Sequence, residues 1–179
     1  MRFWILCVFL WGCSAPNRPP SQVPHMSIEL HADVEFTLYE RHLIGRAVAE
    51  LDKQIGMHVG VKYDLDFRDP VSLIRNKDNA VMVRVDQDNS AVAQLDEQFG
   101  SPVYAVTLPG RQIVVVWERM DRAEMYVSVI MHEFLHTQGV RHVQDKNALM
   151  FGGTNGGTLT PMQVTESDRA AIRRALGQH

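Results

Sequence analysis

Cysteine is almost absent from this chain, which contains two in 179 residues. Both lie near the N-terminus, at Cys7 and Cys13, so residues 27–179 have neither a disulfide nor a cysteine metal ligand. The sequence also lacks internal repeats and low-complexity tracts. Its net charge of −3 gives no reason to expect nucleic acid as a partner. With 45% hydrophobic and 22% charged residues, we expect one globular domain with its own core. We also expect the chain to be a monomer.

No apolar run reaches the roughly 20 residues that span a bilayer. The N-terminal stretch MRFWILCVFLWGC has a positive charge at Arg2 and then a short apolar run, which is typical of a secretory signal segment. Its end, LWGC, resembles the lipobox of bacterial lipoproteins. That resemblance implies a signal peptide over residues 1–12 and lipidation of Cys13. We therefore expect an exported protein, lipid-anchored to a membrane of the bacterial cell envelope; simple secretion is the alternative.

Proline is concentrated just after this segment. SAPNRPPSQVP, residues 14–24, holds half of the eight prolines and almost no apolar bulk, so it favours extended conformations. We expect residues 13–26 to be a lipidated cysteine followed by a tether, and residues 27–179 to be the folded domain. A disordered N-terminus without an anchor is the alternative.

The spacing of apolar residues divides residues 27–179 into secondary-structure elements. The predicted strands cover residues 27–36, 58–67, 80–86, 102–108 and 112–118. The predicted helices cover residues 38–55, 121–138 and 165–177. This order predicts an α/β (α+β) fold in which a mixed five-stranded sheet packs on helices.

Local signals set several of these boundaries. Gly56 is expected to end the first helix, and Thr165 to cap the last one. Asp121 and Glu124 resemble a capping box at the start of the middle helix.

Two strand predictions concern position in the sheet. Pro102 favours an edge position for residues 102–108, because proline has no backbone N–H to donate to a neighbouring strand. The β-branched run of residues 112–118 indicates a strand buried on both faces. The polar stretch DQDNS, residues 86–90, predicts only a turn.

Residues 131–142, MHEFLHTQGVRH, carry most of the chemistry. His132 and His136 are four residues apart, which places both imidazoles on one face of a helix within reach of one metal ion. Glu133 lies about 100° round the helix from His132, where it can contact a water bound to the same ion.

A third ligand is expected from beyond the helix. Gly139 can take the left-handed conformation that turns the chain sharply, and the turn can bring His142 back to the ion. Three histidines leave the fourth tetrahedral position for water, as in catalytic rather than structural zinc sites. A helix with solvated histidines at its end would leave this spacing unexplained.

The full pattern HExxHxxGxxH, followed by Met150 in ALMFG, resembles the metzincin clan of zinc metallopeptidases and, within it, the matrixins. The resemblance implies a metzincin-like catalytic domain with a Met-turn. It implies that His132, His136 and His142 bind one zinc ion above Met150, with Glu133 as general base. Hydrolysis of peptide bonds by a zinc-bound water is then the expected activity.

Two departures from the matrixin pattern stand out. Val143 follows the third histidine, where matrixins usually have serine, and no propeptide with a cysteine switch is recognisable. A zincin in which Glu166 is the third ligand is an alternative, but it would leave Gly139, His142 and Met150 without a role in the site.

Substrate contacts follow from the same resemblance, because metzincins bind their substrate antiparallel to an edge strand. We expect the substrate to be a protein or peptide. The glycines after Met150 would line the pocket beyond the scissile bond, although a plain flexible connection fits them equally well. The expected substrate-binding residues are Val103, Tyr104, Ala105, Val106, Gly152 and Gly153.

Asp86, Asp88 and Asn89 could bind calcium, but their spacing completes no recognised loop, which favours a solvated turn. The remaining histidines, at positions 25, 31, 42, 58 and 179, are expected to be surface or ordinary core residues. A second class of function also remains: a catalytically inactive, metal-binding envelope lipoprotein that acts as a binding module.

Overall fold

A computed structural model describes residues 26–66, 68, 79–152 and 163–177 of the chain. The predicted signal segment, Cys13 and nearly all of the tether lie outside the described residues, as does Gly153. None of the helices in the described part of the chain is long and apolar enough to cross a bilayer.

The described residues form a five-stranded sheet and four α-helices, which confirms the predicted fold class. In chain order the elements are β1 (Met26–Asp33), α1 (Leu38–Ile55), β2 (Met57–Leu65), β3 (Ala80–Val85), α3 (Ser90–Phe99), β4 (Ala105–Leu108), β5 (Gln112–Val116), the 3-10 turn η1 (Trp117–Arg119), α4 (Ala123–Thr137) and α5 (Glu166–Ala175).

The strand order across the sheet is β2-β1-β3-β5-β4. All neighbouring strands are parallel except β4 and β5, which are antiparallel and joined by a tight turn. Strand β4 lies at the edge, as Pro102 predicted, although the strand itself begins only at Ala105. Residues 113–116 of β5 are buried on both faces, as their β-branched run predicted.

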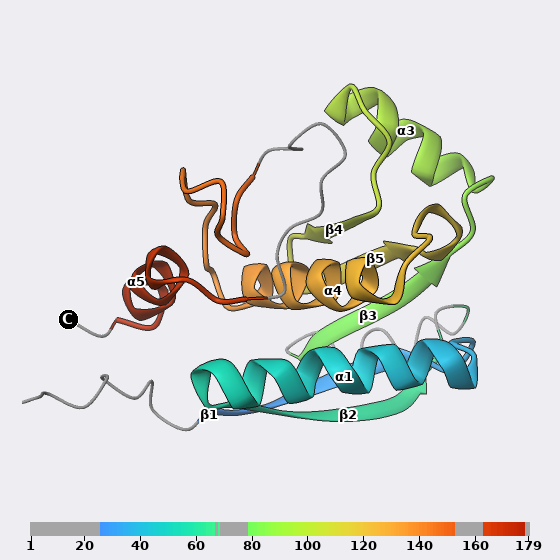
Figure 1. The fold of residues 1–179 in the computed structure, drawn as a ribbon. Helices are drawn as coiled ribbons and strands as arrows, with labels where there is room; N and C mark the ends of the chain where they lie inside the picture. The colour runs from blue at the N-terminus through green and yellow to red at the C-terminus, as the bar shows by residue number, and fades with distance from the viewer. Residues whose placement is uncertain (1–25, 67, 69–78, 153–162, 178–179) are drawn as a thin grey trace, which may run out of the picture.

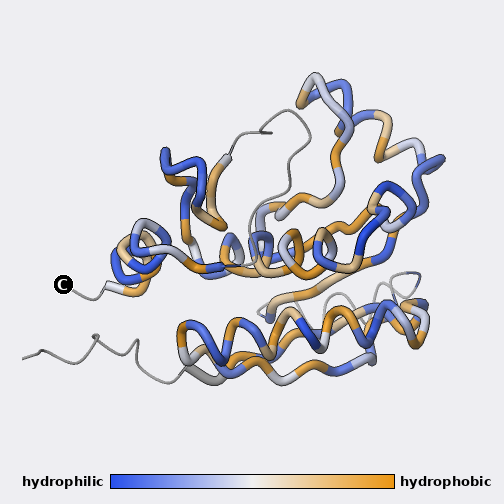
Figure 2. The backbone as a smooth tube through the Cα atoms, viewed as in Figure 1, coloured by the Kyte–Doolittle hydropathy of each residue, from blue (hydrophilic) through white to orange (hydrophobic). Residues whose placement is uncertain are grey.

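Helices α1 and α4 lie side by side across one face of the sheet, and α5 lies beyond the end of α4 (Figure 1). Helix α3 lies at the upper right of the view, and the chain runs down from it into β4. The main core lies between these two helices and the sheet. Alternate residues of each central strand point to opposite faces. Thus Met82, Ile113 and Val115 face the helices, whereas Val83 and Val114 belong to a smaller cluster on the other face. The hydrophobic residues accordingly follow the strands and the facing sides of the two helices (Figure 2).

The caps of α1 and α5 match their sequence signals. Gly56 ends α1 in the left-handed conformation, with φ 70°. Thr165 caps α5 by accepting a hydrogen bond from the backbone N–H of Asp168, and Asp168 returns the contact to the backbone of Thr165.

Helix α3 was not predicted, because the stretch DQDNS indicated only a turn. The same polar residues also cap a helix: the Asn89 side chain accepts a hydrogen bond from the N–H of Ala91 at 2.9 Å. Only Val92 of α3 is buried, so the helix lacks the apolar stripe that reveals a helix in a sequence. Gly100 ends it with φ 67°.

The predicted start of the active-site helix was also wrong. Helix α4 begins at Ala123 with Arg122 as N-cap, and no side chain caps it. Asp121 and Glu124 therefore do not form a capping box. The 3-10 turn η1 precedes the helix and includes residues 117 and 118, which the sequence pattern assigned to the end of the strand that is β5.

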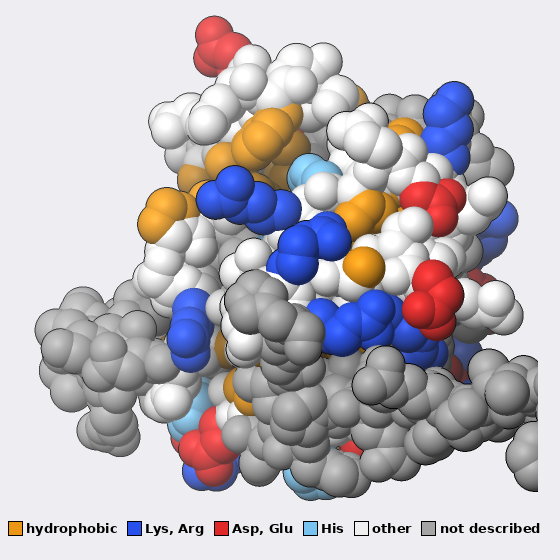
Figure 3. Space-filling view, turned by 90° about the vertical axis from the view of Figure 1, so that its left-hand side faces the viewer, with side chains coloured by type: hydrophobic (Ala, Val, Ile, Leu, Met, Phe, Trp, Pro, Cys, Tyr) orange, Lys and Arg blue, Asp and Glu red, His pale blue; other side chains and the backbone are white. Residues whose placement is uncertain are grey.

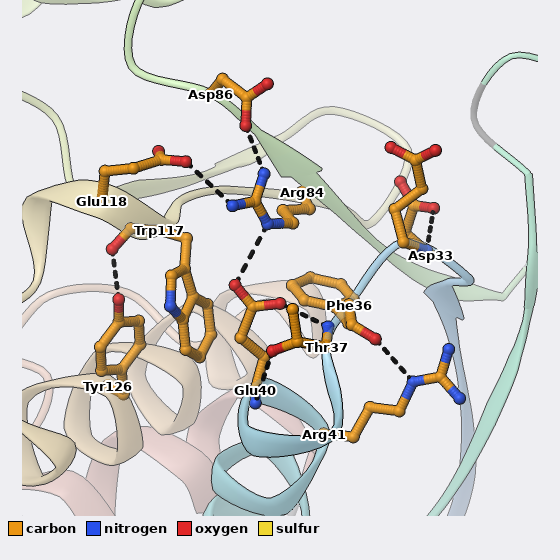
Figure 4. A network of polar contacts seen from close by, with 11 residues as sticks. Asp33, Phe36, Thr37, Glu40, Arg41, Arg84, Asp86, Trp117, Glu118 and Tyr126 are labelled. Atoms are coloured by element: carbon orange, nitrogen blue, oxygen red, sulfur yellow. Dashed lines mark hydrogen bonds and ion pairs between the residues drawn. The ribbon is translucent and has the colours of Figure 1, made fainter.

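A buried polar network ties the start of α1 to the sheet (Figure 4). Glu40, which is 2% exposed, accepts a hydrogen bond from Arg84 Nε on β3 at 3.1 Å and closes the capping box with Thr37. Arg84 also contacts Glu118 at 2.9 Å and Asp86. The Glu40 carboxylate is thus paired within the fold, which is what makes its burial tolerable.

Candidate metal centre and active site

Helix α4 presents His132 and His136 on one side of its last two turns. Their ring centroids are 4.6 Å apart, and both side chains are partly buried. The upstream residues Met125 and Val127 pack into the core, so the helix changes from a structural to a cleft-facing role near its C-terminal end.

The chain reverses directly after this helix. Gly139 has φ 79°, a left-handed conformation that a side chain would strain, and its N–H bonds to the carbonyl oxygen of His136 at 2.9 Å. Val140 is buried and anchors the turn. This reversal brings His142 back, with its ring centroid 4.6 Å from that of His136 and 5.2 Å from that of His132.

The three Nε2 atoms converge on one point. The Nε2 of His136 lies 3.0 Å from the Nε2 atoms of His132 and His142, and those two lie 3.2 Å from each other. Nitrogens bound to one tetrahedral zinc at about 2.0–2.1 Å are separated by about 3.3 Å, close to these spacings. The triad is the only group of three or more potential ligands that the described residues hold in this way.

Backbone carbonyls fix the tautomers of two histidines. Nδ1 of His132 lies 2.7 Å from the carbonyl oxygen of Leu149, and Nδ1 of His136 lies 2.7 Å from that of Val140. A carbonyl oxygen only accepts, so each Nδ1 must carry the hydrogen, and each Nε2 presents a lone pair. The Nε2 lone pairs of His132 and His136 face each other and repel unless a cation lies between them. His142 adds a third imidazole nitrogen at the same point, and the donor set therefore fits zinc.

Electrostatics favour the same protonation state. Burial lowers the pKa values of His132, His136 and His142, because a desolvated imidazolium loses its hydration. Neutral imidazole is the form that binds metal, so the fold prepares all three side chains as ligands.

Glu133 lies beside the triad and lines the same cleft, with 8% of its surface exposed. Burial raises the pKa of its carboxyl group, which opposes the effect of a hydrogen bond from Thr107. The Thr107 hydroxyl lies 2.7 Å from Oε2. The other oxygen, Oε1, has no hydrogen-bond partner among the described residues.

The segment that carries Met150 is held by Asp168 of α5. The fully buried Asp168 carboxylate accepts hydrogen bonds from the backbone N–H groups of Leu149 at 3.0 Å and Met150 at 2.8 Å. Leu149 in turn accepts the bond from His132 described above. Met150 is itself 0% exposed and part of the main core. The sequence predicted a cap at Thr165 but gave no sign that Asp168 also reaches this turn.

Gly152 contacts a histidine rather than open space. A Cβ atom at this position would lie 2.5 Å from Nδ1 and 2.6 Å from Cγ of His142. The absence of a side chain therefore lets the backbone pack against the His142 ring. Gly152 also lines the cleft, where it was predicted.

A cleft of about 750 Å³ opens beside the triad, lined by residues 101–111 on one side and by α4 on the other. Residues 103–106 all line it, and Tyr104 is among the exposed large hydrophobic residues. On the end of the molecule that lies at the left in Figure 1, hydrophobic side chains and a histidine are exposed together above a band of Lys and Arg side chains (Figure 3).

The structure does not gather the other residues that were considered. Asp86 contacts Arg84 and Asn89 caps α3, so neither belongs to a metal-ligand group with Asp88 in the described residues. Glu166 is exposed and contacts Arg169 on its own helix, while the third position beside the paired histidines is taken by His142.

Of the remaining histidines, two lie outside the described residues, at positions 25 and 179. His31 is buried and bonds to Asp64 at 2.8 Å, as an ordinary core residue does. His42 and His58 are exposed.

Comparison with known proteins agrees with this geometry. The profile of the matrixin family matches residues 14–177, which is most of the chain. No curated protein matches the sequence.

Solved structures share the fold at low identity. Archaemetzincin from Methanopyrus kandleri aligns with a TM-score of 0.56 at 19% identity, over 86% of this chain and 97% of its own. A zinc-dependent peptidase from Methanocorpusculum labreanum gives 0.52 at 13% identity, over 81% and 99%. Myroilysin gives 0.52 at 10% identity, over 88% and 96%. The chain belongs to the matrixin family and is a zinc metallopeptidase of the metzincin clan.

Proposed function

We propose that this protein is an endopeptidase that uses one zinc ion, held by His132, His136 and His142, and Glu133 as its general base. The observation that carries the proposal is the convergence of three Nε2 atoms 3.0–3.2 Å apart beside the Glu133 carboxyl group, which lines the same cleft. A zinc ion held there would acidify water and polarise the scissile carbonyl.

The residues of the chain supply the remaining steps. Glu133 takes a proton from the attacking water and later gives it to the nitrogen of the leaving amine. Burial raises the pKa of its carboxyl group, which makes the carboxylate a stronger base toward the attacking water. Met150 forms the hydrophobic floor under the histidines.

Edge strand β4 is the proposed docking site for the peptide. Among the described residues its outer edge has no strand partner, so its backbone groups are free to pair with an extended substrate. The proposed contacts are Val103, Tyr104, Ala105 and Val106, with Gly152 in the lining of the same cleft. Gly153, the remaining proposed contact, lies outside the described residues. A Tyr104→Ala variant should raise KM for peptides; unaltered kinetics on every peptide would remove this strand from the proposal.

Replacing Glu133 with Gln tests the central claim. The variant should bind one zinc ion per chain as the wild type does, while kcat falls by about 10² to 10⁴, because general-base catalysis is lost and the ligands are untouched. Zinc content by elemental analysis and cleavage of an unstructured protein such as casein would be measured together. Equal turnover by the Gln variant and the wild type would exclude Glu133 as the base.

An inactive metal-binding module is the second candidate. It predicts bound zinc with no chelator-sensitive hydrolysis by the wild type. The Glu133 carboxyl group beside the three histidines in the cleft favours catalysis, since a protein that only binds a partner needs no base next to the metal.

The location and assembly are proposals from the sequence. The chain would be exported, cleaved before Cys13, lipidated there and held at a membrane of the cell envelope as a monomer; secretion without an anchor is the alternative. Mass spectrometry of the mature N-terminus would decide between them. Calcium at Asp86, Asp88 and Asn89 is not part of the proposed cofactor set.

A further inference from the structure

Thr107 is the residue on edge strand β4 that contacts Glu133. Its Oγ1 lies 2.7 Å from Oε2 of Glu133 and 2.8 Å from the carbonyl oxygen of the same residue. The two residues are 26 positions apart in the chain, so the contact depends on the packing of β4 against α4.

One hydroxyl hydrogen has two acceptors within reach, and the charge of Glu133 decides between them. If the hydrogen pointed at the carbonyl oxygen, lone pairs of Oγ1 and of an ionised Oε2 would face each other at 2.7 Å. A hydrogen bond to a charged acceptor is also stronger than one to a neutral acceptor. With Glu133 ionised, the hydroxyl therefore donates to Oε2.

That bond divides the carboxylate into two unlike oxygens. Oε2 is occupied by Thr107, whereas Oε1 has no partner among the described residues, and Glu133 lines the cleft. The hydroxyl also fixes the rotation of the carboxylate plane, which is otherwise only weakly restrained in glutamate.

We propose that Thr107 is the positioning residue of Glu133: its hydroxyl holds Oε2, so that Oε1 alone exchanges protons with the cleft. This inference rests on the proposed function. In the step it serves, the O–H bond of the attacking water breaks, a new O–H bond forms on Oε1, and the water oxygen forms a bond to the carbonyl carbon. The C–N bond of the peptide then breaks as the hydrogen on Oε1 moves to the leaving nitrogen, and Oε2 keeps its bond to Thr107 throughout.

The position of Thr107 has a consequence for substrate binding. The strand proposed to pair with the peptide also contacts Glu133 through the side chain of Thr107. Strand β4 would therefore determine both the position of the bound peptide and the orientation of the carboxylate. A structural role for Thr107, as a simple contact between β4 and α4, would affect stability without singling out the chemical step.

Two variants of the full chain separate these roles. Thr107→Val keeps the size and shape of the side chain but removes the hydroxyl, and Thr107→Ser keeps the hydroxyl. For Val we expect kcat to fall about ten- to a hundredfold, with KM and zinc content within about twofold of wild type. Ser should recover most of that loss. Melting temperature would be recorded for each protein.

A second readout does not depend on activity. In protein labelled with ¹³C at the glutamate carboxyl carbons, the resonance of Glu133 is assigned by its loss in Glu133→Gln. It should move in Thr107→Val and stay near its wild-type position in Thr107→Ser, in zinc-free as well as zinc-loaded protein.

The outcomes distinguish the two proposals. An unmoved Glu133 resonance in Thr107→Val, or a loss of activity that only follows lost zinc or lost folded protein, overturns the role of Thr107. A wild type that hydrolyses no peptide defeats the proposed function instead. The resonance then decides alone whether Thr107 holds the carboxylate.

Discussion

Individual backbone atoms orient the candidate zinc ligands. The carbonyl oxygens of Leu149 and Val140 each accept a hydrogen bond from an imidazole Nδ1, and so determine that Nε2 faces the metal. The third ligand is positioned differently, by close contact of its ring with Gly152. The site thus depends on residues that never touch the ion.

Gly152→Ala should weaken zinc binding. The new Cβ would lie 2.5 Å from Nδ1 of His142, closer than real contacts allow, so the ring must move. We expect zinc affinity to fall about 10- to 100-fold, the range found when a contact that orients a ligand is removed. Competition with a fluorescent zinc chelator would measure it.

Gly45→Ala is the matched control for that substitution. Gly45 lies within α1, and nothing lies within 4 Å of an added Cβ. This variant should bind zinc as the wild type does and be equally or more stable, because alanine favours helix. Unchanged zinc affinity in Gly152→Ala would show that the His142 ring tolerates the contact.

At the scale of elements, the site is assembled from α4, the turn at residues 148–150, α5 and β4. Asp168 joins two of them, because its carboxylate caps α5 and also accepts the N–H groups of Leu149 and Met150. The C-terminal helix is therefore connected to His132 through one backbone segment, although it supplies no ligand.

Asp168→Asn should destabilise the fold and weaken zinc binding together. An amide nitrogen cannot accept the hydrogen bonds that the carboxylate accepts, so buried N–H groups would be left without partners. We expect a loss of about 3 kcal/mol in the free energy of unfolding, read from urea denaturation of the zinc-free protein. The exposed Glu166→Gln in the same helix should change stability by less than about 0.5 kcal/mol and keep zinc. Loss of zinc from that control would revive Glu166 as a ligand.

A second connection holds the segment that leads into β4. Arg119 donates two hydrogen bonds of 2.6 Å to Asp96 of α3, and the N–H of Val103 adds one of 2.8 Å. The guanidinium of Arg119 lowers the pKa of Asp96 to about 2, against the usual 3.8.

This pair should contribute stability that disappears in acid. Because the folded state favours the carboxylate, the unfolded chain binds more protons between about pH 4 and pH 2, and stability falls as the pH drops through that window. The melting temperature of the wild type should exceed that of Asp96→Asn above about pH 4, and the gap should close toward pH 2. A gap that stays constant across this range would contradict the assignment. Asp88→Asn, on an exposed turn, is the control for removal of a surface carboxylate elsewhere.

At the scale of the whole molecule, the core and the metal site are distinct sources of stability. The main core runs from β1 and α1 to α5, and it includes Met150, Phe134 and Leu135 around the site. This extent predicts a zinc-free protein that is folded but less stable, because the Nε2 lone pairs of His132 and His136 then face each other without a cation.

Chelation of zinc should lower the melting temperature by roughly 10 °C. Zinc at a thousand times its dissociation constant stabilises the native state by about 4 kcal/mol, and about 2–4 °C corresponds to each kcal/mol in a domain of this size. Adding zinc back should restore the transition, whereas magnesium, which prefers oxygen ligands, should not. A melting temperature that is the same with and without chelator would argue against a bound ion.

The sequence by itself determined the elements with strong local signals and the pattern of the candidate ligands. Caps at Gly56 and Thr165, the β-branched run of β5 and the spacing of His132, Glu133 and His136 are all local, since each depends on residues within a few positions. Helix α3 was not predicted from the sequence, because it buries only Val92 and so has no apolar stripe.

Only the tertiary structure decided how distant residues complete the site. Thr107 meets Glu133 across 26 positions, and Asp168 meets Met150 across 18. Neither separation follows from the periodicity of a helix or a strand, because both contacts arise where separate elements pack. The position of Gly152 against His142 is of the same kind: a glycine in the sequence indicates conformational freedom, and only the fold shows that here it makes room for a ring.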